Sequence, residues 1–141
     1  MTKQNQISMA AALGVAGTLC ATGMIVFGDT RDLAFVNATP VHMLVVSGPS
    51  AALAGWMCRG LFGRRGGIGW FFAGAGAFLA TLLGAAIGGT LIVPMTGTIF
   101  APLIVFWNLV VYPWAGLVWL FTMMSVHILA FKTNGYAVSA A

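Results

Sequence analysis

The chain has 141 residues, of which 60% are hydrophobic and 6% are charged. A soluble domain carries about 25% charged residues, because water must wet its surface. The composition therefore excludes an ordinary soluble globular domain, and the net charge of +4 is too scattered along the chain to indicate nucleic-acid binding. We expect an integral membrane protein that is surrounded by the lipid bilayer.

Four long apolar stretches follow one another, at about 7–27, 35–58, 68–93 and 102–130. Each is long enough to cross a hydrocarbon core of about 30 Å as a helix. A membrane β-barrel is disfavoured because the stretches are continuously apolar and lack its alternating pattern. Helices satisfy their own backbone groups in lipid. With links this short, we expect one all-α domain over 1–141, an up-down bundle of four transmembrane helices.

Small residues recur every four positions in the first three spans, which lets helices approach closely in lipid. The third span carries two such rows, Gly69, Ala73, Ala77, Thr81, Ala85 and Gly89, and Gly76, Ala80, Gly84 and Gly88. Shorter rows are Ala10, Gly14, Thr18 and Thr22 in the first span, and Ser47, Ala51 and Gly55 in the second. We expect these spans to form a tight core, with the aromatic-rich fourth span covering them or meeting another protein or lipid. The alternative use of the rows is a seam between identical copies.

Two prolines interrupt the apolar stretches near mid-depth, Pro49 in the second and Pro113 in the fourth. Proline lacks a backbone donor and clashes with the preceding turn, so we expect a kink or a short unwound stretch at Pro49. The fourth apolar run, from Ile99 to Phe131, would be about 50 Å long as one helix. It must therefore tilt, kink at Pro113, or begin with an interfacial segment before Pro102.

Polar or small residues lie beside both prolines: Ser47, Gly48 and Ser50 in the second span and Asn108 in the fourth. Broken helices that meet near the middle of a membrane form substrate sites in small transporters. These four residues are therefore the candidate site for a small neutral or anionic solute. The alternative is that their polar groups only satisfy freed carbonyls and neighbouring helices.

The two histidines are candidate cofactor ligands. We expect His42 near the outer end of the second span and His127 near the inner end of the fourth. Two histidines that share a haem face each other at one depth, so this placement disfavours a bis-histidine cytochrome. Either histidine could still ligate a haem or chlorophyll singly. Hydrogen bonding at the membrane surface is the alternative role for each.

No carboxylate lies inside a predicted span, because the two acidic residues, Asp29 and Asp32, follow the first span. Cys20 and Cys58 are predicted at different depths, which disfavours a disulfide, and we interpret both as apolar fillers. The sequence thus indicates neither catalytic residues nor a metal site.

Basic residues flank alternate ends of the spans, namely Lys3, Arg59, Arg64, Arg65 and Lys132. The remaining one, Arg31, lies between the two acidic residues. Because basic residues concentrate on the cytoplasmic side, we expect both termini in the cytoplasm, and the short loops fit a bacterial inner membrane.

These features favour a small accessory, assembly or structural subunit of a larger membrane complex, without catalytic activity of its own. Its partners would be other membrane subunits or further copies of the chain. The first alternative is a homo-oligomeric channel or carrier for a small neutral or anionic solute. The second is a membrane subunit that holds a haem or chlorophyll.

Overall fold

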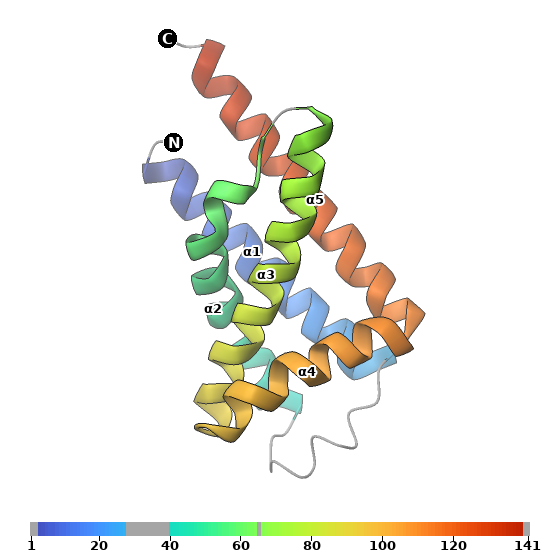
Figure 1. The fold of residues 1–141 in the computed structure, drawn as a ribbon. Coiled ribbons are helices and arrows are strands. Elements are labelled where there is room, and N and C mark those ends of the chain that lie inside the picture. Colours follow the sequence, from blue (N-terminus) through green and yellow to red (C-terminus); the bar gives the residue numbers. More distant parts are fainter. Residues whose placement is uncertain (1–2, 28–39, 65, 140–141) are drawn as a thin grey trace.

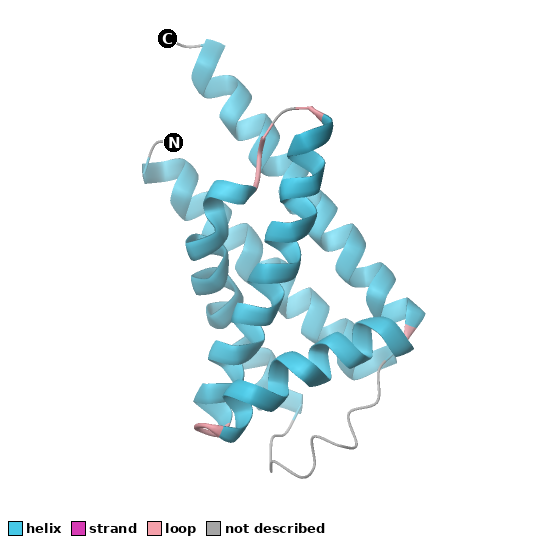
Figure 2. Cartoon of the chain, in the orientation of Figure 1, coloured by secondary structure: helices cyan, strands magenta, loops and turns pink. Residues whose placement is uncertain are grey.

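The computed structural model describes residues 3–27, 40–64 and 66–139, with side chains described for 6–27, 40–64 and 66–132. Within these ranges the chain forms helices joined by short loops, and no strand (Figure 2). The elements are α1 (Lys3–Phe27), α2 (Pro40–Cys58), the 3-10 turn η2 (Arg59–Leu61), α3 (Gly67–Ile92), α4 (Thr96–Val111) and α5 (Pro113–Ser139). The all-helical prediction is confirmed for the described residues.

Four helical segments are long and apolar enough to cross a membrane. They are Gln6–Phe27 in α1, Pro40–Leu61 over α2 and η2, Gly67–Ile92 in α3 and Pro113–Lys132 in α5. The remaining helix, α4, is apolar but shorter. These properties indicate an integral membrane protein.

The long helices run side by side and α4 crosses them obliquely (Figure 1). α2 packs against both α1 and α3, α5 packs against α1, and α4 packs against α3. The first residues of α1, the last residues of α5 and the α2–α3 link all lie at one end of the bundle, and α4 lies at the other. The hydrophobic core draws on every long helix but not on α4; its members are Met9, Leu13, Ala16, Cys20, Cys58, Phe62, Ala77, Ala80, Met123, Val126 and Ala130.

The close α1–α2 contact depends on glycines, which have no side chain. A Cβ at Gly14 would lie 3.2 Å from the carbonyl oxygen of Gly48, and a Cβ at Gly17 would collide with Ala51. From the other side, Gly55 makes room for Leu13, which is 1% exposed. The small-residue rows of the first two spans therefore face each other and bring the two backbones close.

The small-residue face of α3 turns mainly toward α2. A Cβ at Gly84 would lie 3.5 Å from Cα of Ala51, and one at Gly88 would lie 3.4 Å from Oγ of Ser50. The opposite, bulky face is exposed at Leu79. Packing within the chain, as predicted for these rows, is what the structure shows. Other row members contact different elements: Gly69 meets Arg64 of the α2–α3 link, Gly76 meets Leu61 of η2, and Gly89 meets α4.

The predicted fourth span, 102–130, is not one continuous helix, because the helix divides at Tyr112. This residue has an extended conformation (φ −108°, ψ 95°) that ends α4, and Pro113 begins α5. Proline disfavours a helical conformation in the residue before it and cannot donate a backbone hydrogen bond. Of the three ways to accommodate the long run, the chain uses a break at Pro113.

The other intramembrane proline behaves differently. α2 continues as a helix through Pro49, so the unwound stretch predicted there is absent. Packing explains the difference, because α1 contacts Gly48 and α3 contacts Ser50, so neighbouring helices hold the backbone on both sides of the proline.

Hydroxyl groups on the spans bond mostly to their own helices. Each hydroxyl donates to the backbone carbonyl four residues earlier, at 2.6–3.1 Å. The pairs are Thr18 to Gly14, Thr22 to Thr18, Thr81 to Ala77, Thr90 to Ala86, Thr122 to Val118 and Ser125 to Phe121. Even the exposed hydroxyls of Thr22 and Ser125 are satisfied in this way. Hydroxyls bonded in this way present no unpaired donor to hydrocarbon, which suits a lipid environment.

The basic side chains that the structure describes lie at the end of the bundle that holds both termini. Arg59 and Arg64 belong to the α2–α3 link, and Lys132 lies toward the carboxyl end of α5. The remaining charges of the predicted loops, at Asp29, Arg31, Asp32 and Arg65, lie outside the described residues.

Candidate functional site

Two of the four candidate solute-binding residues contribute to helix packing. Oγ of Ser47 donates to the carbonyl of Leu44 at 3.0 Å, and the Ser47 carbonyl lies against Gly17 of α1. Gly48 also faces α1, where a Cβ would lie 2.9 Å from Oγ1 of Thr18. Both residues therefore face α1 and have partners there or in their own helix.

Ser50 points the other way, toward α3. Its side chain is 2% exposed and faces Gly88, yet its Oγ has no hydrogen-bond partner. A buried hydroxyl without a partner costs about 1–3 kcal/mol relative to a satisfied one. Ser50 therefore holds an unused donor and acceptor at the α2–α3 contact.

Asn108 is the second residue of this kind. It lies in the last turn of α4, is 5% exposed, and its Nδ2 donates to the carbonyl of Ile104 at 3.0 Å. Its Oδ1 has no partner. Among the buried side-chain nitrogen and oxygen atoms that the structure describes, Oδ1 of Asn108 and Oγ of Ser50 are the two that remain unpaired.

The four candidates face different parts of the bundle. Ser47 and Gly48 face α1, Ser50 faces α3, and Asn108 belongs to the oblique α4. The prolines also differ in position, because Pro49 lies inside α2 whereas Pro113 forms the corner between α4 and α5. α2 is therefore not broken at Pro49, whereas the chain does break at Pro113, and a solute site at these residues stays a prediction. What remains is a pair of neutral polar atoms suited to hydrogen bonding.

The two histidines lie at opposite ends of the bundle, since His42 is in the first turn of α2 and His127 is near the α2–α3 link. His42 is exposed. His127 is 3% exposed, its Nδ1 accepts a hydrogen bond from the Gly63 amide at 3.4 Å, and its ring centroid lies 4.6 Å from that of Trp70. The pair cannot ligate one haem together. In the described part of the chain, no three His, Cys, Asp or Glu residues are grouped as metal ligands.

Two polar contacts between helices involve residues whose partners the sequence did not predict. Nε1 of Trp119 on α5 donates to Oγ1 of Thr81 on α3 at 2.8 Å. Sγ of Cys20 on α1 lies 3.2 Å from Oγ1 of Thr122 on α5. The available signal was the indole of Trp119, since a buried Trp N–H usually finds a partner. The contacts tie α5 to α3 and α1.

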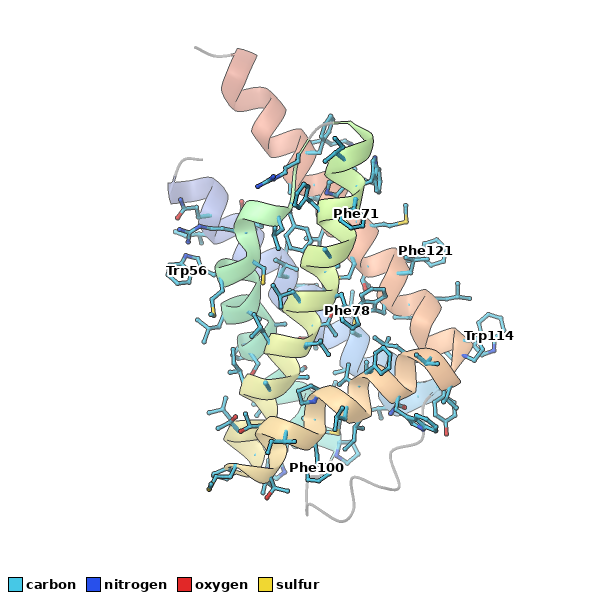
Figure 3. All side chains as sticks on the ribbon, viewed as in Figure 1. Trp56, Phe71, Phe78, Phe100, Trp114 and Phe121 are labelled. Atoms are coloured by element: carbon cyan, nitrogen blue, oxygen red, sulfur yellow. The ribbon has the colours of Figure 1, made fainter. Side chains whose placement is uncertain are left out.

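The outer face of α4 is apolar. Its side chains recur at helical spacing and are exposed: Ile99, Phe100, Leu103, Phe106, Trp107 and Val110. Trp114 and Phe121 of α5 are also exposed, and Figure 3 shows both pointing away from the bundle. The opposite side of α4 contacts α3 through Gly97 and Ala101, which meet Gly89. We call this outer surface the α4 face.

Comparisons of the chain with protein-family models, with curated proteins and with solved structures gave no significant match. The features that bear on function are therefore those of the chain itself. They are the α4 face and the two buried, unpaired polar atoms of Ser50 and Asn108.

Proposed function

We propose that this chain is an accessory, assembly or structural subunit of a larger membrane complex, without catalytic activity of its own. The observation that carries the proposal is the α4 face. A helix of 16 residues is about 24 Å long, which is less than the hydrocarbon core that a spanning helix must cross. α4 therefore presents its large side chains at the end of the bundle opposite the termini, without itself completing a span.

The shape of the α4–α3 contact suits such a role. Gly89 and Gly97 lie backbone to backbone, so α4 is fixed closely to α3 on its inner side. Its outer side offers aromatic rings, which are enriched at protein interfaces and supply large contact areas with few rotatable bonds. A partner membrane helix would find a rigid, preorganised surface there.

We also propose that the chain lies in a bacterial inner membrane with both termini in the cytoplasm. Arg59, Arg64 and Lys132 lie at the end of the bundle that holds both chain termini. The bias of basic residues toward the cytoplasm supports this orientation.

Purification of the tagged full chain from its native membrane in mild detergent tests the proposal. We expect a partner protein at constant stoichiometry, and we expect its loss in a Phe100→Ala/Trp107→Ala variant. The matched control is Val41→Ala/Val45→Ala, which alters exposed side chains of α2. Recovery of the wild-type chain alone, as a monomer or homo-oligomer, would contradict the proposal, as would equal loss of the partner in both variants.

A second candidate function rests on Ser50 and Asn108. Their unpaired atoms suit a small neutral polar solute, which would be hydrogen-bonded by Oγ of Ser50 or by Oδ1 of Asn108. A homo-oligomeric channel or carrier is the corresponding activity. Proteoliposomes containing the pure chain should then show solute flux that falls in Ser50→Ala and Asn108→Leu variants. Ser125→Ala is the control, because that hydroxyl is exposed and bonds to its own helix. Flux equal to that of empty vesicles across a broad solute panel would rule the activity out.

A further inference from the structure

The α2–α3 link carries two arginines that are held by aromatic rings. The guanidinium carbon of Arg59 lies 4.7 Å from the ring centroid of Trp56. That of Arg64 lies 4.5 Å from the ring centroid of Phe72, and its Nε donates to the carbonyl of Gly60 at 3.1 Å. Because Gly60 directly follows Arg59, both arginine side chains are anchored around the same turn, η2.

These contacts leave hydrogen-bonding capacity. A guanidinium group has five N–H donors in a planar fork, and stacking on a ring uses its face rather than its edge. The chain has two acidic residues, Asp29 and Asp32, and both follow α1 rather than α2. The fork geometry of arginine matches the oxygens of a phosphate group.

The link is open on one side. A Cβ built at Gly60 in η2, or at Gly66 or Gly67 after it, would have no contact within 4 Å apart from its chain neighbours. Trp56 is 49% exposed and points outward from α2 (Figure 3). An indole that is half exposed at the end of a spanning helix is typical of the membrane–water interface, where lipid headgroups lie.

We propose that Trp56, Arg59 and Arg64 form a binding site for the headgroup of an anionic phospholipid. The two guanidinium edges would donate to the phosphate oxygens. The Trp56 indole would lie beside the lipid at the level of the interface, holding Arg59 in position. The site is independent of the function proposed above, because it uses neither the α4 face nor the buried polar atoms.

Native mass spectrometry of the full chain in mild detergent, titrated with phosphatidylglycerol or with phosphatidylcholine, tests the proposal. We expect stronger retention of phosphatidylglycerol. Arg59→Gln and Arg64→Gln should each weaken binding of that lipid about fivefold. The double variant Arg59→Gln/Arg64→Gln should weaken it about 25-fold. Arg59→Lys/Arg64→Lys keeps the charge but loses the fork, so its binding should fall between those of the wild type and the glutamine variant.

Lys132→Gln is the matched control, because Lys132 is exposed at the same end of the bundle but belongs to α5. It should leave phosphatidylglycerol binding within twofold of wild type. An effect as large as that of Arg64→Gln would show diffuse attraction and overturn the site. Displacement of the lipid by millimolar inorganic phosphate would overturn the assignment to a lipid. Helix content and gel-filtration profiles like those of the wild type establish that the variants are folded.

Discussion

Glycines on a single helix of this protein meet very different surroundings. A Cβ at Gly76 of α3 would lie 2.7 Å from Cβ of Leu61, whereas nothing lies within 4 Å of one at Gly74, two residues earlier. On α1, a Cβ at Gly17 would collide with Ala51. The effect of adding a methyl group therefore depends on rotation around the helix axis.

Gly17→Ala and Gly74→Ala should have different effects on the free energy of unfolding. Overpacking a close helix contact costs about 1–3 kcal/mol, so Gly17→Ala should lower the free energy of unfolding by that amount. Gly74→Ala adds a methyl group to open space and should be neutral or stabilise the helix by about 0.5–1 kcal/mol. Unfolding by SDS in mixed micelles, followed by circular dichroism, measures both. Equal effects would show that the α1–α2 contact is not as close as described.

A size series at Gly84 probes the α2–α3 contact. Its nearest neighbours, in Ala51 and Ala54, lie 3.5–3.7 Å from a Cβ, which is ordinary van der Waals distance. Gly84→Ala should therefore be tolerated, whereas Gly84→Leu should prevent the helices from closing and reduce the yield of folded protein. Gel filtration of both variants after mild extraction tests this; a leucine variant that extracts and elutes like wild type would contradict the assigned packing.

The Trp119–Thr81 hydrogen bond should contribute measurably to stability. Hydrogen bonds between membrane helices contribute about 0.6 kcal/mol on average. A double-mutant cycle with Trp119→Phe and Thr81→Val should give a coupling of about that size. The comparison cycle pairs Trp114→Phe with Thr81→Val. It should show no coupling, because Trp114 is exposed on the outside of α5.

At the scale of elements, the division of the last apolar run sets the shape of the molecule. α4 turns back along α3 after Met95, which has a positive φ of 64°, and stays there because Gly89 meets Gly97. α5 then takes a new direction at Pro113. The chain therefore changes direction at both ends of α4.

Spin-label distances should reveal the bend. Labels attached after Leu103→Cys and Leu120→Cys substitution, with Cys20 and Cys58 replaced by alanine, sit on exposed positions of α4 and α5. A straight helix would place these positions about 25 Å apart. We expect electron spin resonance to give a shorter distance than this in the doubly labelled chain. A distance at or above the straight-helix value would mean that α4 and α5 form one helix.

The sequence predicted the helical class and the packing faces of the first three spans because small residues at four-residue spacing leave a readable pattern. It named Pro113 as one possible break in the last apolar run but did not decide among a tilt, a kink and an interfacial segment, since apolar character continues from Ile99 to Phe131. Pro49 and Pro113 show why: the same residue type lies within one helix and begins another, and packing against neighbours decides the outcome. The surroundings of Ser50, Asn108 and Trp119 likewise depend on how the helices are rotated against each other.

For the whole molecule, the main expectation is that the α2–α3 link and the start of α4 lie on opposite sides of the membrane. Gly60 and Thr98 mark these two ends, and both are exposed. Gly60→Cys should react with a membrane-impermeant thiol reagent only after cells are opened. Thr98→Cys should react in intact cells, because the termini are expected in the cytoplasm. The native Cys20 and Cys58 are buried and set the background. Labelling of both variants from the same side would contradict the orientation.

The contact between His127 and Gly63 has a consequence for the order in which the protein is made. The link that carries Gly63 leaves the ribosome well before the helix that carries His127, because the two residues are 64 positions apart. Until that last helix is synthesised and inserted, the Gly63 amide lacks its acceptor and the Trp70 ring lacks its neighbour. The early turn is therefore completed by a residue that is translated late, so ribosome-bound chains that stop before α5 should expose this turn to protease more readily than the finished protein does.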